Sequence, residues 1–192
     1  MTRELPLFPL ATVLFPGGPL SLRIFETRYL DMVASVLRGD NRFGVLAIRA
    51  GSEVGEAETF SVGTTAEIVD WEHSGGLLAI RAVGRDCFTI EQSERRPDGL
   101  YVGRVAWLDE PPATPLPSEH AKLSGLLETV LRQLPIYAGV ATAYDDAVWV
   151  GARLAEILPF TLVLKQSLLE MRDPLARLDK IAAGLRAEVS LA

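Results

Sequence analysis

The 192-residue sequence predicts an α+β fold: a small, partly closed, mostly antiparallel β-barrel with one helix, followed by a bundle of four helices. Before residue 115, short runs rich in β-branched and aromatic residues alternate with glycine-containing turns. After it, leucines recur at helical spacing. Four prolines lie between positions 111 and 117 and predict a stiff linker. We therefore expect two parts, residues 1–115 and residues 116–192.

Seven segments of the first part have the composition of strands and are bounded by turn-forming residues. They are residues 5–10, 20–24, 43–48, 59–70, 77–83, 87–91 and 101–107. Ser74-Gly75-Gly76 and Pro97-Asp98-Gly99 are typical of hairpin turns. Between the second and third strands, apolar residues at i, i+3 and i+4 spacing predict a helix that begins near Phe25 and ends before Gly39.

The second part contains four helical segments with recognisable ends. Ser118 is the expected cap of the first, which Pro135 ends, and Asp145 that of the second, which precedes Pro159. The third covers about residues 161–171. Pro174 opens the fourth, since proline is favoured at the first helical position.

Charge and composition exclude several classes of protein. The formal net charge of −6 and pI near 5.0 argue against a nucleic-acid surface, which needs a basic face. No apolar run approaches the ~18 residues of a membrane span, and no signal peptide is recognisable at the start, so we expect a cytoplasmic protein without membrane contact. Cys87 is the single cysteine, which excludes an internal disulfide.

No motif for catalysis, cofactor or metal binding is present. The sequence lacks a phosphate-binding G-x-x-x-x-G-K-[ST] loop and a G-x-G-x-x-G turn. Lys165 and Ser167 are two residues apart on a predicted helix, so they point in different directions and do not form a Ser-Lys dyad. His73 and His120 have no second ligand at metal-binding spacing. We expect no enzyme, no ATP hydrolysis and no proteolysis, and leave open a small hydrolase that uses His73 or His120.

The opening of the chain resembles one family closely. The motifs are LPLFPL at residues 5–10, VLFPGGPL at 13–20 and LRIFETRY at 22–29. They resemble the N-terminal substrate-binding domain of the ATP-dependent Lon protease, and more specifically the stand-alone bacterial proteins that consist of that domain. Residues 43–45, 63–68, 83–88, 158–159, 165–166, 168–170 and 177–178 continue the resemblance in order. Thr27 departs from it, because the family often has proline there.

The resemblance implies a PUA-like barrel followed by a helical bundle, without the ATPase and protease modules of Lon. It implies a non-catalytic module that binds exposed apolar or unfolded polypeptide segments, with clients or a protease or chaperone as partners. Strand addition at a barrel edge or a groove between barrel and bundle would hold the segment, and we favour the groove. A PUA-type RNA or small-molecule binding module is an alternative, although the negative charge of residues 1–115 argues against RNA.

The candidate partner-binding residues surround the opening motifs. They are Phe15, Arg23, Phe25, Glu26, Arg28 and Tyr29. We expect Phe25 to lie in the core with Phe15 and Tyr29, so that Phe25→Ala largely unfolds the barrel. Arg28→Ala is expected to change stability by less than about 1 kcal/mol, as for an exposed ion pair. In the alternative, the aromatic side chains are exposed and hold client peptides.

Overall fold

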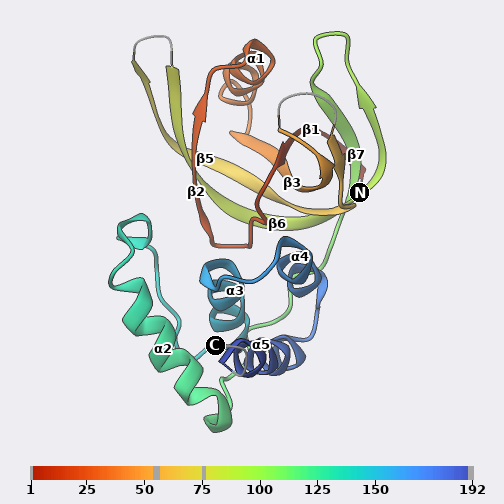
Figure 1. Cartoon of the computed structure of the whole chain (residues 1–192). Helices are drawn as coiled ribbons and strands as arrows, with labels where there is room; N and C mark the ends of the chain where they lie inside the picture. Colours follow the sequence, from red (N-terminus) through yellow and green to blue (C-terminus); the bar gives the residue numbers. More distant parts are fainter. Residues whose placement is uncertain (1, 54–56, 75–76, 190–192) are drawn as a thin grey trace. The chain divides into compact units, whose positions relative to one another are not determined.

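The computed structural model describes residues 2–53, 57–74 and 77–189 (Figure 1). The chain divides into two compact units, Met1–Asp109 (unit 1) and Glu110–Ala192 (unit 2). The division falls at the start of the proline-rich segment that the sequence marks as a linker.

Unit 1 is a mostly antiparallel sheet with one α-helix among its described residues, α1 (Thr27–Val36). The strand order is β1-β7-β6-β5-β3-β4, and β2 pairs with β6 outside this path. The strands are β1 (Thr2–Leu10), β2 (Pro19–Ile24), β3 (Arg42–Gly51), β4 (Ala57–Thr59), β5 (Val62–Ser74), β6 (Leu77–Arg95) and β7 (Tyr101–Trp107). Strand β1 also pairs with β3, in parallel. The pairings therefore lead from β1 through β7, β6, β5 and β3 back to β1.

Several element boundaries differ from the sequence prediction. The segments 77–83 and 87–91 belong to one 19-residue strand, β6. The predicted strand 59–70 is divided between β4 and β5. In β6, Gly84 does not end the strand, because its N–H donates to Gly18 O and its carbonyl accepts from Gly17 N, both at 2.8 Å. Gly75 and Gly76 of the predicted hairpin turn lie outside the described residues, although Ser74 and Leu77 on either side are paired.

The sequence alternation of β1 separates two apolar clusters. Phe8 and Leu10 belong to the larger cluster, which α1 covers with Tyr29, Met32 and other buried side chains. Leu5 and Leu7 belong to a smaller cluster with Leu46, Phe88 and Val105. Period-2 alternation therefore gives β1 an apolar contact on each face of the sheet.

Unit 2 contains α2 (Ala121–Leu131), α3 (Ala147–Ile157), α4 (Leu162–Glu170) and α5 (Pro174–Val189), and α3 packs against the other three. Asp146, not Asp145, caps α3, because its carboxylate accepts from Val148 N at 3.0 Å. Ser118 begins the short 3₁₀ helix η1 (Ser118–His120) instead of α2. Within the described residues, no helix has the length and apolar content to cross a bilayer.

The expectation of a mostly antiparallel sheet with several helices is confirmed. The PUA-like character of the barrel and the four-helix bundle as such stay predictions.

The contact at Gly84 yields a test of the fold. A Cβ at Gly84 would lie 2.1 Å from the carbonyl oxygen of Phe15, which is backbone and cannot move aside. We expect Gly84→Ala to lower the free energy of unfolding by at least about 2 kcal/mol in urea denaturation. Gly125→Ala is the matched control, because nothing lies within 4 Å of its Cβ position in α2. It should raise stability by up to about 1 kcal/mol, and an unchanged urea midpoint for Gly84→Ala would contradict the close contact.

Candidate functional site

The outward face of the three strands β5, β6 and β2 carries a shallow depression of about 560 Å³. Two cross-strand rows form it: Asp70–Arg81–Ser21 and Glu72–Ala79–Arg23. Ala79 is small and lies between two long side chains, so the surface is hollow above it. We call this area the ribbon surface: residues 21–23, 70–72 and 79–81.

Large apolar side chains are exposed at and beside the ribbon surface. Trp71 lines the depression and is 55% exposed, and Val69, two residues before it, is 54% exposed. Phe25 follows the end of β2 and is 66% exposed. Val69 and Trp71 lie on β5 and Phe25 lies just after β2, and these two strands flank β6. Single exposed apolar residues are common, but several in one region of a sheet are typical of interaction sites.

Charged side chains line the same depression. Arg81 donates a hydrogen bond to Asp70, which holds the pKa of that carboxyl below its usual value. Arg23 is exposed and lines the depression. The two rows therefore offer charges of each sign, whereas Trp71, in the row Trp71–Ile80–Leu22, lies on the opposite face of the strands.

The structure separates the predicted partner-binding residues into two groups. Arg23 is exposed in the ribbon surface and Phe25 is exposed just after β2, whereas Phe15 is 0% and Tyr29 is 2% exposed. The prediction that Phe25 is a core residue is wrong. The reason is that α1 begins at Thr27, so Phe25 precedes the helix, and the alternation of β2 that turns Ile24 inward turns Phe25 outward.

Arg28 is buried, which also contradicts the sequence prediction. Its guanidinium donates to Gly99 O at 3.0 Å and to Glu53 O at 3.3 Å, and pairs with Glu26 at 2.8 Å. It also lies 4.6 Å from the centre of the Tyr29 ring. Arg28 thus connects the start of α1 with the β6–β7 turn and with the segment after β3.

The Tyr29 ring stacks on Phe8 with 3.8 Å between ring centres and 11° between ring planes. Burial raises the pKa of Tyr29 to about 12, and the nearby Arg28 guanidinium opposes that shift. Glu26, Arg28 and Tyr29 therefore position α1, and their first role is structural.

Sequence analysis missed Trp71, and the local pattern gives no signal of its exposure. Trp71 lies between Asp70 and Glu72, and this alternation predicts an apolar side chain that faces the core, opposite to the two carboxylates. Trp71 lies in the cross-strand row Trp71–Ile80–Leu22 and is 55% exposed, although Ile80 is 2% exposed. Only the pairing pattern reveals that position.

The candidate catalytic groups do not form a site. His73 is exposed on β5, and His120 is buried beside Asp179, with 3.2 Å between Nε2 and Oδ1. Among the described residues, no serine, threonine or cysteine is hydrogen-bonded to either histidine, and no cluster of three metal-ligating side chains occurs. Cys87 is buried.

The structure pairs Ser167 with Lys180, not with Lys165. Lys180 Nζ donates to Ser167 Oγ at 3.0 Å, and Ser167 Oγ donates to Leu164 O at 2.8 Å. A general base would accept the hydroxyl proton instead. Lys165 donates to the backbone carbonyl of Glu156 at 2.7 Å, and burial lowers the pKa of this lysine.

The Glu156 side chain is the centre of a buried polar network in unit 2. It accepts from the Tyr137 hydroxyl at 2.7 Å and pairs with Arg153 at 3.0 Å. Burial raises the pKa of Glu156, and Arg153 opposes that shift. Since Glu156 has both a hydrogen-bond donor and an ion-pair partner within unit 2, we interpret this network as structural.

Comparison with known proteins gives a consistent result over nearly the whole chain. The family model of the "ATP-dependent protease La (LON) substrate-binding domain" matches residues 4–186. A Lon N-terminal domain protein from Xanthomonas campestris is 38% identical with a TM-score of 0.79, over 94% of this chain and 98% of that one. The N-terminal domain of the Mycobacterium avium complex Lon protease is 17% identical, with a TM-score of 0.64 over 93% of this chain and 96% of that one, and shares the fold.

Cereblon proteins match a shorter region. Cereblon from Xenopus tropicalis is 33% identical over 113 residues, and cereblon from Danio rerio is 31% identical over 113 residues. Each match covers 56% of this chain but only 24% and 26%, respectively, of the cereblon chain. The chain therefore spans about a quarter of the length of these relatives.

The contrast between Arg28 and Phe25 is testable. Arg28→Ala leaves the Gly99 carbonyl without its buried donor, so we expect the free energy of unfolding to fall by roughly 2–4 kcal/mol. Phe25→Ala removes an exposed ring and should change it by less than about 0.5 kcal/mol. Chemical denaturation of both variants measures the difference. Equal stability of the two variants would contradict the buried contacts of Arg28.

The raised pKa of Tyr29 predicts a loss of stability at alkaline pH. The folded state keeps the phenol proton up to about pH 12, whereas the unfolded chain loses it near pH 10.0, the ordinary pKa of tyrosine. Stability is therefore complete below pH 10 and falls as pH rises toward 12. Over that window, wild type should lose about 2 kcal/mol more than Tyr29→Phe. Denaturation at pH 9 and pH 11 covers the first half of this loss, for which we expect a difference of about 1 kcal/mol between the two proteins. An equal loss of stability in both would contradict the prediction.

Proposed function

Because the chain belongs to the Lon substrate-binding domain family, we propose that it is a non-catalytic module that binds exposed apolar segments of other polypeptides. Family membership makes it a substrate-binding domain. The apolar or unfolded character of the bound segment, the absence of catalysis and the binding surface are our proposals. The observation that carries them is the exposure of Trp71 and Val69 on β5 and of Phe25 just after β2.

The ribbon surface suits an extended polypeptide. Trp71 and Phe25 offer large, rigid contact areas that lose little conformational entropy on binding. Arg23 and Glu72 lie one on each side of Ala79, so polar groups of a bound chain have partners of either sign. Affinity would come from the apolar contacts, and the charges would orient the segment.

Strand β2 adds a second mode of contact. Among the described strands it pairs with β6 alone, so its other edge has backbone groups available for strand addition. Pro19 blocks only the first position of β2. The groove between the two halves, which the sequence favoured, stays a prediction beside this surface.

The alternatives have less support. A hydrolase needs a nucleophile near His73 or His120, and the described residues contain no such hydrogen bond. An RNA-binding module needs a basic surface, whereas residues 1–109 contain 11 arginines and 15 acidic residues. Under our proposal the chain acts in the cytoplasm with polypeptide clients, or with a protease or chaperone that receives them.

Binding to an unfolded protein tests the proposal. We expect Trp71→Ser and Phe25→Ser each to weaken binding of fluorescently labelled casein by roughly five- to thirtyfold, because central aromatic contacts dominate such interfaces. The melting temperature should stay unchanged, since both side chains are exposed. Fluorescence anisotropy and a thermal melt measure the two effects.

Val163→Ser is the matched control for these variants. Val163 is as exposed as Phe25 but lies on α4 in unit 2. It should bind casein as wild type does. An equal loss in the control, or no loss in the two aromatic variants, would contradict the proposed surface.

A further inference from the structure

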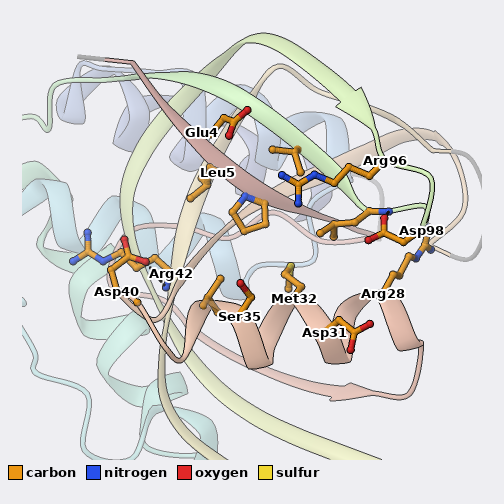
Figure 2. Close-up of a pocket in the computed structure, with 15 residues that line it drawn as sticks. Glu4, Leu5, Arg28, Asp31, Met32, Ser35, Asp40, Arg42, Arg96 and Asp98 are labelled. Atoms are coloured by element: carbon orange, nitrogen blue, oxygen red, sulfur yellow. Dashed lines mark hydrogen bonds between the residues drawn. The ribbon is translucent and has the colours of Figure 1, made fainter.

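A second hollow in unit 1 lies between α1 and the strands β1 and β7 (Figure 2). We call it the α1 groove. Its volume is about 350 Å³, and its apolar lining comes from Leu5, Met32, Val36, Leu100 and Val102, all of which are buried. Ligand pockets have volumes of roughly 300–1,000 Å³, so this one has room for one or two side chains.

Charged side chains surround the apolar lining. Four are acidic: Glu4, Asp31, Asp40 and Asp98. Three are arginines: Arg28, Arg42 and Arg96. In Figure 2, Arg42 and Asp40 lie at one end of the groove, Arg28 and Asp98 lie at the other, and Arg96 reaches inward between them.

Two of the three arginines are neutralised by carboxylates outside the groove. Arg28 pairs with Glu26 at 2.8 Å. Arg42 pairs with Glu67 at 3.0 Å and with Asp86 at 2.9 Å. Within the described residues, Arg96 is the only arginine of the groove without an acidic partner. Glu4, Asp31 and Asp98 therefore face a single uncompensated positive charge, and the groove is electronegative.

We infer that the α1 groove takes a basic side chain of a bound polypeptide, lysine in the first place. Lysine matches both parts of the groove: its aliphatic stem packs on the apolar lining, and its ammonium group meets the carboxylates. This inference rests on the proposed function, and it adds a preference for clients with a positive charge in or beside the apolar segment.

The backbone of β1 supports an extended guest at this place. Over Glu4 to Pro6, β1 pairs with β7, while its pairing with β3 begins only at Leu7. Among the described strands, the second edge of these residues is therefore unpaired, and Glu4, Leu5 and Pro6 all line the groove. A client segment alongside this edge would have backbone partners while its lysine enters the groove.

Three matched peptides test the inference by fluorescence anisotropy. All share one apolar sequence, with lysine, norleucine or glutamate at its centre. We expect wild type to bind the lysine peptide about two- to fivefold more tightly than the norleucine peptide, and the glutamate peptide more weakly than either. Raising the salt concentration to 0.5 M should reduce these differences.

The same three peptides are then compared on variants of the groove residues. Asp31→Asn combined with Glu4→Gln should reduce the preference for lysine at least about twofold without changing the affinity for norleucine. Arg96→Gln should strengthen binding of the lysine peptide about twofold, because it removes a like charge. Glu94→Gln is the control: Glu94 is an exposed carboxylate on β6 outside the groove, and its loss should leave the preference intact.

A covalent readout locates the peptide. Residues 1–115 contain no lysine, so carbodiimide coupling between the peptide's lysine and a carboxylate of unit 1 has no competitor from a lysine within unit 1. Mass spectrometry should find Asp31 or Glu4 as the coupled residue. Coupling only to carboxylates outside the groove would overturn the inference.

The outcomes separate the two proposals. Equal affinity of wild type for the lysine and norleucine peptides would overturn this inference and leave the proposed function standing. Weaker binding of the lysine peptide to Arg96→Gln would overturn it too and would point to recognition of an acidic group. Failure of wild type to bind any of the three peptides would overturn the proposed function and this inference with it.

Discussion

Unit 1 depends on the pairing of β1 with two strands that are far away in the sequence. Residues Thr2–Leu7 pair with β7 and residues Leu7–Leu10 pair with β3, so Leu7 alone has registered partners on both sides. Pro6 and Pro9 each lie where β1 has one partner strand, which is where a residue without an N–H is tolerated. Because β1 pairs with both β7 and β3, the hydrogen-bonded strands form a closed sequence from β1 back to β1. Before Leu7, β1 is not paired with β3, and these residues lie beside the α1 groove.

Close approach of strands makes side chains impossible at certain positions. A Cβ at Gly44 would lie 2.8 Å from Leu5 and Leu7, and one at Gly63 would lie 2.3 Å from the carbonyl oxygen of Val45. These glycines allow β3 and β5 to approach the cluster around Phe88. Strand β1 therefore has two different surroundings. Residues Leu7–Leu10 pack closely against β3, whereas Glu4, Leu5 and Pro6 line the open α1 groove.

The contacts of Arg28 fix the position of α1 on the sheet of unit 1. Its contacts with Gly99 O and Glu53 O join the helix to two loops that the strands present at the same end of unit 1. Because Tyr29 stacks on Phe8 immediately beside it, the charged contact and the apolar contact position the same helical turn. The helix leaves Phe25 outside, which places an apolar ring beside β2, and it forms one wall of the α1 groove with Met32 and Val36.

The sequence by itself determined the features that depend on neighbouring residues. Alternation in the strands, the turn at Gly99, the helix that opens at Pro174 and the proline-rich segment between the units follow from local backbone preferences. The opening motifs also identified the family. Only the tertiary structure decided that Arg28 is buried, that Phe25 and Trp71 are exposed, and that four carboxylates surround one groove. Exposure depends on which distant segment covers a side chain, and that partner is set by strand pairing across the whole unit, which no local pattern encodes.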